Sequence, residues 1–347
     1  MKKTILLIIL LIICATFFFS CSTVPEKTVL RAIIIPKFEE GEMTGDFPGE
    51  AQLFYERYCP GCEEIAIPHM PVTAHFYLNE ENGVGILVTG SGKTASGFSL
   101  LTLLSLEGYD CSDAYIVSVG CAGGSVGYSK PGDVVLVTAV CDYDLGHQVD
   151  TRDMANSDSA VTWFPDEAYV DYSYKHLDTG LCERVYQMIK DCPLHTTELT
   201  KRVLQENYPS WDDVYDDPVV LKGTDVSGDN YWKGAYGHVT ARYIAKYYNC
   251  PDPFAVTEME EIAIANAASC YDMLDRVISL RVIVNSDLFM DAEIPESLWL
   301  EDTNINEKFA RNNSETFDIF ETAMHNLFDT ASIVIDAVLD GEIAVQP

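Results

Sequence analysis

Beyond residue 21 the sequence lacks any apolar run long enough to cross a membrane. A membrane-spanning helix needs about 20 predominantly apolar residues, and polar residues interrupt every later hydrophobic stretch sooner than that. The apolar stretch Ile5–Phe19 is a single segment, and one segment cannot form a transport path. The sequence therefore excludes a channel or carrier built from several membrane helices.

Basic residues are also scarce. The chain has 22 Lys and Arg against 54 Asp and Glu, which gives a formal net charge of −32. A surface with this charge repels the phosphates of nucleic acids and of anionic lipid headgroups. Because 48% of the residues are hydrophobic, the chain is folded rather than disordered. We expect no nucleic-acid partner.

No linker rich in Gly, Ser or Pro, no repeat and no low-complexity tract divides the chain after its N-terminus. The roughly 320 residues that remain could form one large domain or two, and one domain over residues 31–345 is the simpler interpretation. Residues 194–220, with Pro209, Trp211 and an acidic run, are interpreted as an excursion from its core.

The first 21 residues have the pattern of an export signal. Lys2 and Lys3 precede the apolar stretch, which ends at Ser20-Cys21. The end of this segment resembles a bacterial lipoprotein cleavage box, in which Cys21 is acylated, although Phe18 stands where leucine is usual. We expect an exported, membrane-anchored lipoprotein of the cell envelope with residues 22–30 as a tether. Ordinary cleavage and an uncleaved anchor are the alternatives.

Cysteine is abundant, but it does not form a metal-binding pattern. Cys14 leaves with the signal and Cys21 would carry the lipid, so nine of the eleven cysteines remain, and an odd number cannot all pair within one chain. Cys59 and Cys62 have redox or zinc-knuckle spacing, but no second pair or His cluster completes a tetrahedral site. We expect no metal or cofactor. A disulfide or two fits an exported protein, with the pairing left open.

Short buried strands alternate with helical patterns along the chain, which predicts an α/β sandwich around a central sheet. The expected strands are apolar runs of a few residues: Leu30–Pro36, Gly85–Thr89, Ala114–Val119, Asp133–Val137 and Ile278–Val284. The expected helices are Ala95–Glu107, Asp178–Lys190, His238–Tyr247, Ile262–Ala268 and Glu315–Leu339.

The stretch Val256–Ala265 is the first candidate site. Three carboxylates and Met259 lie in the first turn of an expected alanine-rich helix, with Thr257 as the expected N-cap and Glu260 at capping-box spacing. A helix N-terminus keeps carboxylates ionised, and an ionised carboxylate can accept hydrogen bonds from a sugar diol. The alternative is that Glu260 only caps the helix.

Four loop segments are further candidates. Gly90–Thr94 is similar to a phosphate loop but lacks its first glycine, so we expect a tight strand-to-helix turn. Gly120–Gly124 is either a plain turn or a place where a ligand approaches the backbone closely. Asp225–Trp232 carries adjacent aromatic residues that belong either to a core or to a base-stacking loop. Asn285-Ser286-Asp287 follows the last strand, where ligands gather in open α/β sheets and where turns are also common.

In chain order, these segments resemble the purine nucleoside permease (NUP) family, which in turn is similar to the nucleoside phosphorylase/nucleosidase superfamily. The resemblance runs over roughly residues 31–290 and includes five motifs in the family's order. They are Phe47–Phe54; Ile116–Gly124 with Gly132-Asp133 and Asp150–Met154; Gly228–Gly234; Thr257–Ala263; and Leu280–Asp287.

The resemblance implies a three-layer α/β/α sandwich with a central mixed sheet, dimeric or trimeric. It also implies purine nucleoside binding and cleavage of the N-glycosidic bond. By position, Glu260 would hold the ribose hydroxyls, with Met259 under the sugar and Glu258 assisting. Tyr231 would stack on the base and Glu50 would activate water. The nucleophile side would be lined by Gly120, Cys121, Ala122 and Gly123.

The leaving purine normally receives a proton or hydrogen bond from an aspartic acid in the last motif. The resemblance puts Asn285 at that position, and an amide donates a hydrogen bond but no proton. Asp287, two residues later, is the acid if its side chain reaches the base. If it does not, Asn285 only orients the base.

Water is favoured over phosphate as the nucleophile. Superfamily phosphorylases neutralise phosphate with an arginine and a serine, whereas Ser118 and Cys121 stand at those positions here. Arg152 or Arg281 could replace the arginine only if the fold brings them close. We expect a nucleosidase that serves nucleoside salvage or uptake. The alternatives are a non-catalytic nucleoside-binding lipoprotein feeding a transporter and a catalytically silent relative.

Overall fold

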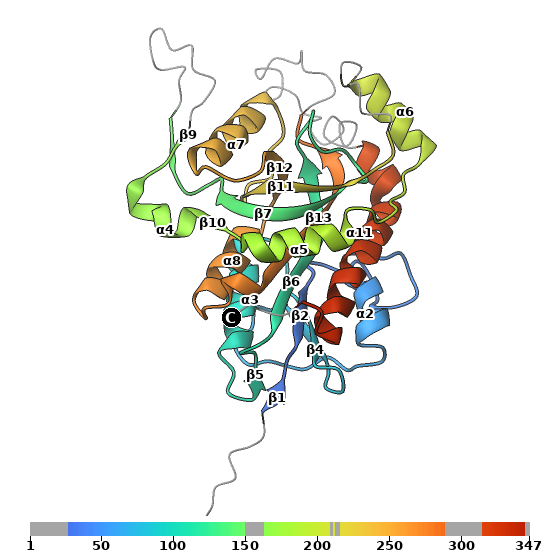
Figure 1. Ribbon diagram of the computed structural model, residues 1–347, viewed down its shortest axis with the longest axis vertical. Coiled ribbons are helices and arrows are strands. Elements are labelled where there is room, and N and C mark those ends of the chain that lie inside the picture. Colours follow the sequence, from blue (N-terminus) through green and yellow to red (C-terminus); the bar gives the residue numbers. More distant parts are fainter. Residues whose placement is uncertain (1–26, 150–162, 209–210, 212–215, 289–313, 344–347) are drawn as a thin grey trace, which may run out of the picture.

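The computed structural model describes residues 27–149, 163–208, 211, 216–288 and 314–343 (Figure 1). Its main feature is a nine-stranded mixed sheet in the order β10-β7-β11-β12-β6-β2-β4-β3, with β13 paired to both β6 and β7. The strands are β2 (Ala32–Ile35), β3 (His75–Asn79), β4 (Val84–Val88), β6 (Tyr115–Gly124), β7 (Val134–Asp142), β10 (Tyr174–His176), β11 (Val220–Ser227), β12 (Phe254–Glu258) and β13 (Val277–Ser286). Two short ladders pair β1 (Thr28–Val29) with β5 (Tyr109–Asp110) and β8 (His147–Gln148) with β9 (Trp163–Phe164).

The sheet closes on itself around β13. This strand runs parallel to β6 and antiparallel to β7, while β7, β11, β12 and β6 follow one another in the main order. These five strands therefore form a ring. Register shifts in β11, between Gly223 and Thr224, and in β13, between Ile283 and Asn285, lie in the curved part. Such irregularities increase strand twist and bending.

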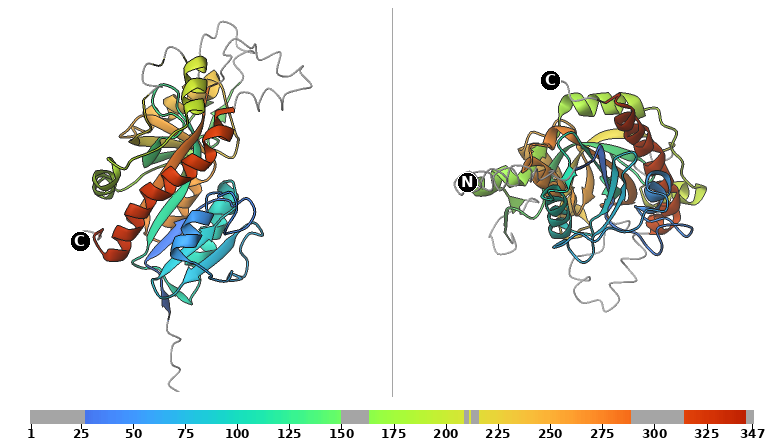
Figure 2. Two further views of the ribbon diagram at one scale, coloured as in Figure 1. Left: turned by 90° about the vertical axis from the view of Figure 1, so that its right-hand side faces the viewer. Right: turned by 90° about the horizontal axis from the view of Figure 1, so that it is seen from below.

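Helices cover both faces of the sheet, which makes the fold an α/β/α sandwich (Figures 1 and 2). On one side lie α2 (Gln52–Tyr58), α5 (Thr179–Ile189) and the long α11 (Ser314–Asp340), which packs on β13 and β6. On the other side α3 (Lys93–Leu104) packs against α8 (Glu261–Ser269). The view from below shows α11 and the α3–α8 pair on opposite sides of the strands. The remaining helices are α4 (Val170–Ser173), α6 (Glu198–Asn207) and α7 (Ala235–Tyr247).

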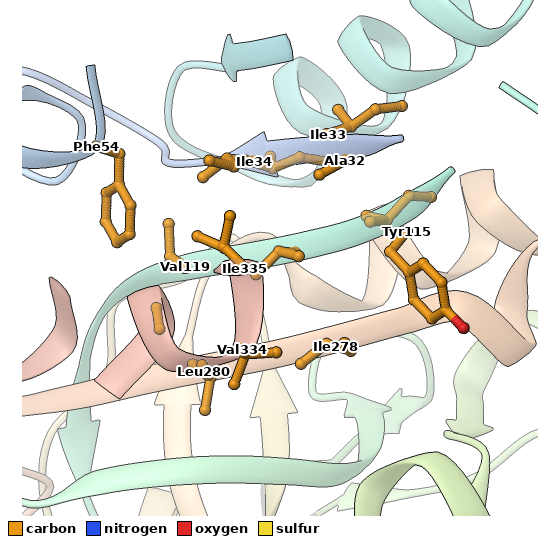
Figure 3. Close-up of a cluster of buried hydrophobic side chains, with 14 of the residues drawn as sticks. Ala32, Ile33, Ile34, Phe54, Tyr115, Val119, Ile278, Leu280, Val334 and Ile335 are labelled. Carbon is orange, nitrogen blue, oxygen red and sulfur yellow. The ribbon is translucent and has the colours of Figure 1, made fainter. Parts of the chain in front are cut away.

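The largest part of the hydrophobic core lies between the sheet and α11. Side chains of β2, β6 and β13 meet Val334 and Ile335 of α11 and Phe54 of α2 (Figure 3). Ile34, Ile278 and Ile335 are fully or almost fully removed from solvent. Burial of a side chain of this size contributes about 1.5–3 kcal/mol, so this face fixes the strands whose ends carry the candidate site.

The sequence prediction of strands and helices is largely confirmed. Each of the five expected strands and five expected helices overlaps an observed element of the same type. The prediction missed β3, β10, β11 and β12. In β11, Gly223 breaks the apolar pattern; it is required because a Cβ there would stand 2.3 Å from the Cβ of Ala255 on the neighbouring strand. The expected excursion over 194–220 contains α6 and reaches β11 at Val220.

Gly237 in α7 provides space for Trp232, and this contact gives a stability prediction. A Cβ on Gly237 would lie 2.0 Å from the indole ring. In a helix interior, alanine is normally more stable than glycine by about 1 kcal/mol. We expect the opposite here: Gly237→Ala should lower the melting temperature by several degrees because the indole must move.

Gly180→Ala is the matched control. Gly180 lies in the first turn of α5, where a Cβ would meet only the ends of the Asp178 and Arg184 side chains, at 3.3 and 3.4 Å. Thermal melts of both variants should diverge, with Gly180→Ala unchanged or stabilised. Equal melting temperatures for the two variants would contradict the role assigned to the Trp232 contact.

Candidate functional site

The predicted site residues surround one cavity of about 150 Å³, which we call the central cavity. It lies where the ends of β6, β12 and β13 meet the segments that follow β2, β4 and β11. Of the residues predicted from sequence, all except Gly120 and Asp287 line it. The lining residues are Lys37, Phe38, Glu50, Ser91, Cys121, Ala122, Gly123, Tyr231, Thr257, Glu258, Met259, Glu260, Val284 and Asn285.

Two further cavities adjoin the central one. An outer cavity of about 450 Å³ shares Lys37, Phe38 and Ser91 with it. A small recess of about 30 Å³ shares Tyr231 and Asn285 and extends to Asp287. Pockets for small molecules usually measure about 300–1,000 Å³. The central cavity alone is below this range, whereas the connected cavities provide enough space for a ligand of nucleoside size.

The carboxylate of Glu50 is held by two backbone amides at one wall of the cavity. Its Oε2 accepts a hydrogen bond from Lys37 N at 2.8 Å and its Oε1 accepts one from Cys121 N at 2.7 Å. The side chain is almost completely buried, and α2 begins two residues later. These contacts fix the direction of the carboxylate, so its remaining lone pairs face a defined position.

The expected glycine turn at residues 120–124 is wrong, because these residues belong to strand β6. The glycines serve close packing of site side chains instead. A Cβ on Gly120 would lie 2.5 Å from Arg281 Nη1, and one on Gly123 would lie 2.9 Å from Asn285 Oδ1. Cys121 lies next to Gly120 in the same strand. Burial, followed by the charge of the Glu50 carboxylate, raises the pKa of Cys121 well above its usual value, so its thiol stays protonated.

The expected capping box at Thr257 and Glu260 is also wrong. Thr257 lies in β12, and α8 begins at Glu261 without a side-chain cap from Glu260. Glu258 performs this role: its Oε2 accepts hydrogen bonds from Glu260 N at 2.7 Å and Glu261 N at 2.9 Å. The Glu258 carboxylate therefore holds the N-terminus of α8 in place while it also lines the cavity.

Arg281 holds two of the carboxylates from below the cavity. Its Nη2 lies 3.0 Å from Glu258 Oε2 and 2.7 Å from Glu261 Oε2, and all three side chains are almost or fully buried. Burial alone would raise the pKa of Glu258, but the adjacent guanidinium and further hydrogen bonds bring it below its usual value. Arg281 is opposite Gly120 in the β13–β6 register, which gives the guanidinium its space.

Lys37 is a residue that the sequence prediction missed. Its Nζ donates hydrogen bonds to Ile35 O at 2.8 Å, Val119 O at 3.0 Å and Ser118 Oγ at 2.7 Å. Ser118 in turn donates to Glu261 Oε2 at 2.5 Å. Burial, followed by the charge of Arg281, lowers the pKa of Lys37 to about 8. Its position directly after an apolar strand was the only sequence signal that could have identified it.

Glu260 lines the cavity as predicted, but its ionisation differs from the prediction. Its Oε1 accepts a hydrogen bond from Gly92 N at 2.8 Å, at the start of α3. Burial and then the charge of Glu258 raise the pKa of Glu260 to about 8. This carboxyl group is therefore mainly protonated at pH 7, whereas the sequence predicted a carboxylate.

Asp225 of β11 is a second buried carboxyl group with an altered pKa. Its oxygens accept no hydrogen bond from the described residues. Burial and the charge of Glu258 raise its pKa well above the usual value. The two cations Lys37 and Arg281 lie near five buried carboxyl groups, those of Glu50, Asp225, Glu258, Glu260 and Glu261. Protonation of Asp225 and Glu260 reduces the excess negative charge of this cluster.

The adjacent aromatic residues divide between the core and the site. Trp232 stacks on Tyr143 with ring centroids 5.2 Å apart and also contacts Phe254. Tyr231 has 48% of its surface exposed and lines the central cavity. Its hydroxyl accepts a hydrogen bond from Asn285 Nδ2 at 3.1 Å. Tyr231 and Glu260 therefore reach one cavity from different segments, as the sequence predicted.

Asp287 lies behind Asn285, in the recess. Its Oδ1 accepts a hydrogen bond from Val126 N at 3.0 Å, and its Oδ2 lies 2.6 Å from His238 Nδ1 of α7. The Asp287 side chain is fully buried. Between the two candidates for the leaving-group position, Asn285 lines the central cavity and Asp287 does not.

A network around Lys93 connects the start of α3 with the loops that follow β7 and β11. The predicted turn at Gly90–Thr94 is confirmed, with Gly90 and Gly92 at positive φ and α3 starting at Lys93. Lys93 Nζ contacts Asp142 at 2.9 Å and Asp144 at 2.8 Å, and Lys93 N donates to Asp229 at 2.7 Å. This lysine therefore joins the base of α3 to the loop that leads to Tyr231.

Some predicted positions lie outside the described residues. They are Cys21 with the export signal, and Asp150–Met154, which includes Arg152. Within the described part, no group of three or more His, Cys, Asp or Glu side chains is arranged to hold a metal ion. No helix among the described residues combines the length and apolar character that a membrane span needs.

The sequence matches the model of one known protein family over most of its length. A family model described as purine nucleoside permease (NUP) matches residues 29–342. The chain belongs to the NUP family. A protein of Schizosaccharomyces pombe described as a probable purine nucleoside permease is 22% identical over 214 residues, which is 55% of this chain and 59% of that protein. The match thus spans less than two thirds of that NUP relative.

Solved structures that resemble this fold include a nucleosidase and a futalosine hydrolase. The 5′-methylthioadenosine/S-adenosylhomocysteine nucleosidase of Neisseria meningitidis has a TM-score of 0.52 at 16% identity, covering 89% of this chain and 99% of that one. The futalosine hydrolase of Helicobacter pylori has a TM-score of 0.51 at 13% identity, covering 88% and 97%. At this identity the likeness establishes the nucleoside phosphorylase/nucleosidase fold for the NUP chain.

The raised pKa of Glu260 gives a second stability prediction. Because the folded-state pKa of about 8 exceeds the ordinary value of 4.5, the folded protein binds one more proton than the unfolded chain between these values. Stability therefore decreases as pH rises from about 4.5 to about 8. Glu260→Gln removes this loss, so we expect its melting temperature to exceed that of the wild type at pH 8–9 and to approach it near pH 4.5.

Glu261→Gln is the contrasting variant for the same melts. The Glu261 carboxylate pairs with Arg281 and accepts a hydrogen bond from the Ser118 hydroxyl. Its replacement by a neutral amide should therefore destabilise the protein at pH 8–9. Stabilisation by both variants, or by neither, would contradict the assignment of the extra proton to Glu260.

Proposed function

We propose that this protein binds purine nucleosides and hydrolyses their N-glycosidic bond. The observation that carries the proposal is the convergence of Glu50, Glu260, Tyr231 and Asn285 on one cavity. Membership of the NUP family supports a purine nucleoside as ligand, and the shared fold with nucleosidases supports glycosidic cleavage. We propose a role in nucleoside salvage or uptake.

The ribose lies between Glu260 and Met259 in this proposal. The hydroxyls of the sugar bind the Glu260 carboxyl group, whose second contact to Gly92 N keeps it in place. As the glycosidic bond breaks, positive charge develops on the sugar ring. Fixed negative groups beside the ring stabilise that charge, and the carboxyl-rich wall around Glu258 provides such groups.

Glu50 is the base that activates the attacking water. It is the cavity-lining carboxylate oriented by Lys37 N and Cys121 N. A water bound to its free lone pairs can lose a proton to Glu50 while its oxygen attacks the anomeric carbon. General-base catalysis of this kind contributes about 10²–10⁴-fold.

The purine ring stacks on Tyr231, and Asn285 orients it by donating a hydrogen bond from Nδ2. This donor also binds the Tyr231 hydroxyl in the structure, so both side chains adjust together when a base enters. Asn285 supplies no proton. Leaving-group activation is thus weaker than with an acid, and slow turnover is expected.

Phosphate is disfavoured as a co-substrate. Lys37 uses the three protons of its ammonium group on Ile35 O, Val119 O and Ser118 Oγ. Arg281 is fully buried and pairs with Glu258 and Glu261. Lys37 therefore has no proton left for a ligand. Arg281 does not line the central cavity, although its Nε and Nη1 have no hydrogen-bond partner among the described residues. A dianion needs charge-assisted donors that reach it.

The lipid anchor on Cys21, the cell-envelope location and a dimeric or trimeric state remain part of this proposal. The binding-only function is the second candidate, and Asn285 favours it because the site lacks a proton donor at that position. In that case the protein would deliver nucleosides to a transporter. The activity assays distinguish the two candidates.

The direct test measures base release from inosine and adenosine by the signal-less protein, with and without phosphate. We expect free base and ribose in both conditions, and Glu50→Gln should reduce release by about 10²–10⁴-fold while nucleoside binding persists. Glu63→Gln, a change at an exposed carboxylate, should leave release unchanged. Phosphate-dependent release with ribose 1-phosphate would overturn the hydrolytic proposal, and binding without release would establish the second candidate.

Asn285→Asp tests the leaving-group assignment. An acid at this position can protonate the departing purine, so we expect release to increase about tenfold or more near pH 6, within the range of general-acid effects. A nitrophenyl riboside, whose leaving group needs no proton, should gain nothing. Asn230→Asp adds the same charge to the lining of the recess and should not increase release.

A different result would assign the acid elsewhere. If Asn285→Asp brings no gain and Asp287→Asn abolishes release with intact folding, Asp287 is the proton donor. Its pairing with His238 would then have to open during turnover.

A further inference from the structure

We propose that Cys141 and Cys250 form a disulfide when the chain folds in an oxidising environment. Their sulfur atoms lie 3.4 Å apart in the structure, although 109 residues separate them in sequence. Cys141 is in β7, and Cys250 follows α7 on the connection to β12. The inference is independent of the proposed function.

The backbone around both residues directs the two thiols towards each other. Cys141 is fixed within a buried strand of the ring. At the end of α7, Asn249 has a left-handed φ of 51° and Cys250 N donates to Ala245 O at 3.1 Å. Asparagine is a common residue at such helix ends. The resulting turn brings Cys250 back onto β7, and bond formation at about 2.05 Å needs only a small approach of the sulfurs.

The two thiols differ in reactivity. The hydrogen bond from Cys141 lowers the pKa of Cys250, whereas burial raises the pKa of Cys141 well above its usual value. Cys250 also lines a separate cavity of about 800 Å³, together with Arg242 and Lys246. Since the thiolate is the reactive form, Cys250 is the thiol that an oxidant reaches first.

The reaction balances with an external disulfide as oxidant. The Cys250 thiolate attacks one sulfur of a small disulfide, which releases one thiol and leaves a mixed disulfide. Deprotonated Cys141 then attacks Cys250 Sγ and releases the second thiol. The protein loses two electrons and two protons, and the external disulfide is reduced to two thiols.

The cross-link would stabilise the part of the fold that carries the site. It joins β7 to the segment leading into β12, the strand that ends in Thr257 and Glu258. A disulfide that closes a loop of this length restricts the unfolded chain strongly. On the same strand, Asp142 follows Cys141 and holds Lys93, so the bond also secures the α3 contact.

The test equilibrates the full chain, folded, with oxidised and reduced glutathione and then maps its peptides without reduction. We expect a peptide pair joined through Cys141 and Cys250, the loss of two titratable thiols, and a melting temperature about 5 °C or more above that of the reduced protein. Cys141→Ala and Cys250→Ala should each abolish the difference between oxidised and reduced samples. Cys270→Ser, at an exposed thiol, should retain it.

Two results would overturn the proposal. The first is the absence of the linked peptide pair after equilibration with excess oxidised glutathione. The second is a redox-dependent melting temperature that persists in both alanine variants, which would assign the effect to another pair such as Cys59 and Cys62. If the alanine variants fold poorly, thiol counting and peptide mapping of the wild type still decide between these outcomes.

Discussion

The buried guanidinium of Arg281 is the contact on which the rest of the site depends. It pairs with Glu258 at the end of β12 and with Glu261 at the start of α8, and so joins β13 to both elements. Removal of one partner from a buried ion pair costs about 3–5 kcal/mol because it leaves an uncompensated charge. The pair also explains Gly120: any side chain there would occupy the space of the guanidinium. One arginine therefore determines the sequence of two neighbouring strands.

The charge around this contact is unbalanced, and that imbalance determines the state of the cavity. Two cations cannot neutralise five carboxyl groups, and burial followed by the charge of Glu258 keeps protons on two of them. Asp225 accepts no hydrogen bond from the described residues and Glu260 accepts one from Gly92, and both have raised pKa values. Glu50, with two backbone donors, is better solvated by the protein. Because Glu260 keeps its proton at neutral pH, a diol that donates hydrogen bonds to it, or a positive charge that develops beside it, would favour its ionised form.

The sequence predicted the elements with apolar runs, but not those whose residues serve the site. Strands such as Gly85–Thr89 were recognisable because burial on both faces gives a continuous apolar pattern. In β11 and β12, Gly223, Asp225 and Thr257 interrupt that pattern for reasons that lie in neighbouring strands. The wrong prediction of a capping box has the same cause. Glu258 and Glu260 are both carboxylates near a helix start, and only the three-dimensional contacts show that Glu258 accepts the hydrogen bonds of the amides. Tyr231 and Asn285 were correctly placed at the cavity by the family motifs, whereas Lys37 and the Asp287–His238 pair required the three-dimensional contacts.

The geometry of Glu50 helps to distinguish a catalytic function from a binding-only function for this NUP-family protein. A receptor needs hydrogen-bond donors and acceptors that match the free ligand. In the proposed complex, Glu50 would be a second buried carboxylate across the sugar from Glu260, and it would weaken binding of a neutral nucleoside unless its oxygens accept hydrogen bonds. Burying a charge is costly without compensation, and here two backbone amides provide it from separate elements. Such an arrangement is useful when a group must accept a proton from a defined position. The fixed carboxylate therefore favours the proposed hydrolysis over simple capture, and in that proposal Asn285 would limit the rate.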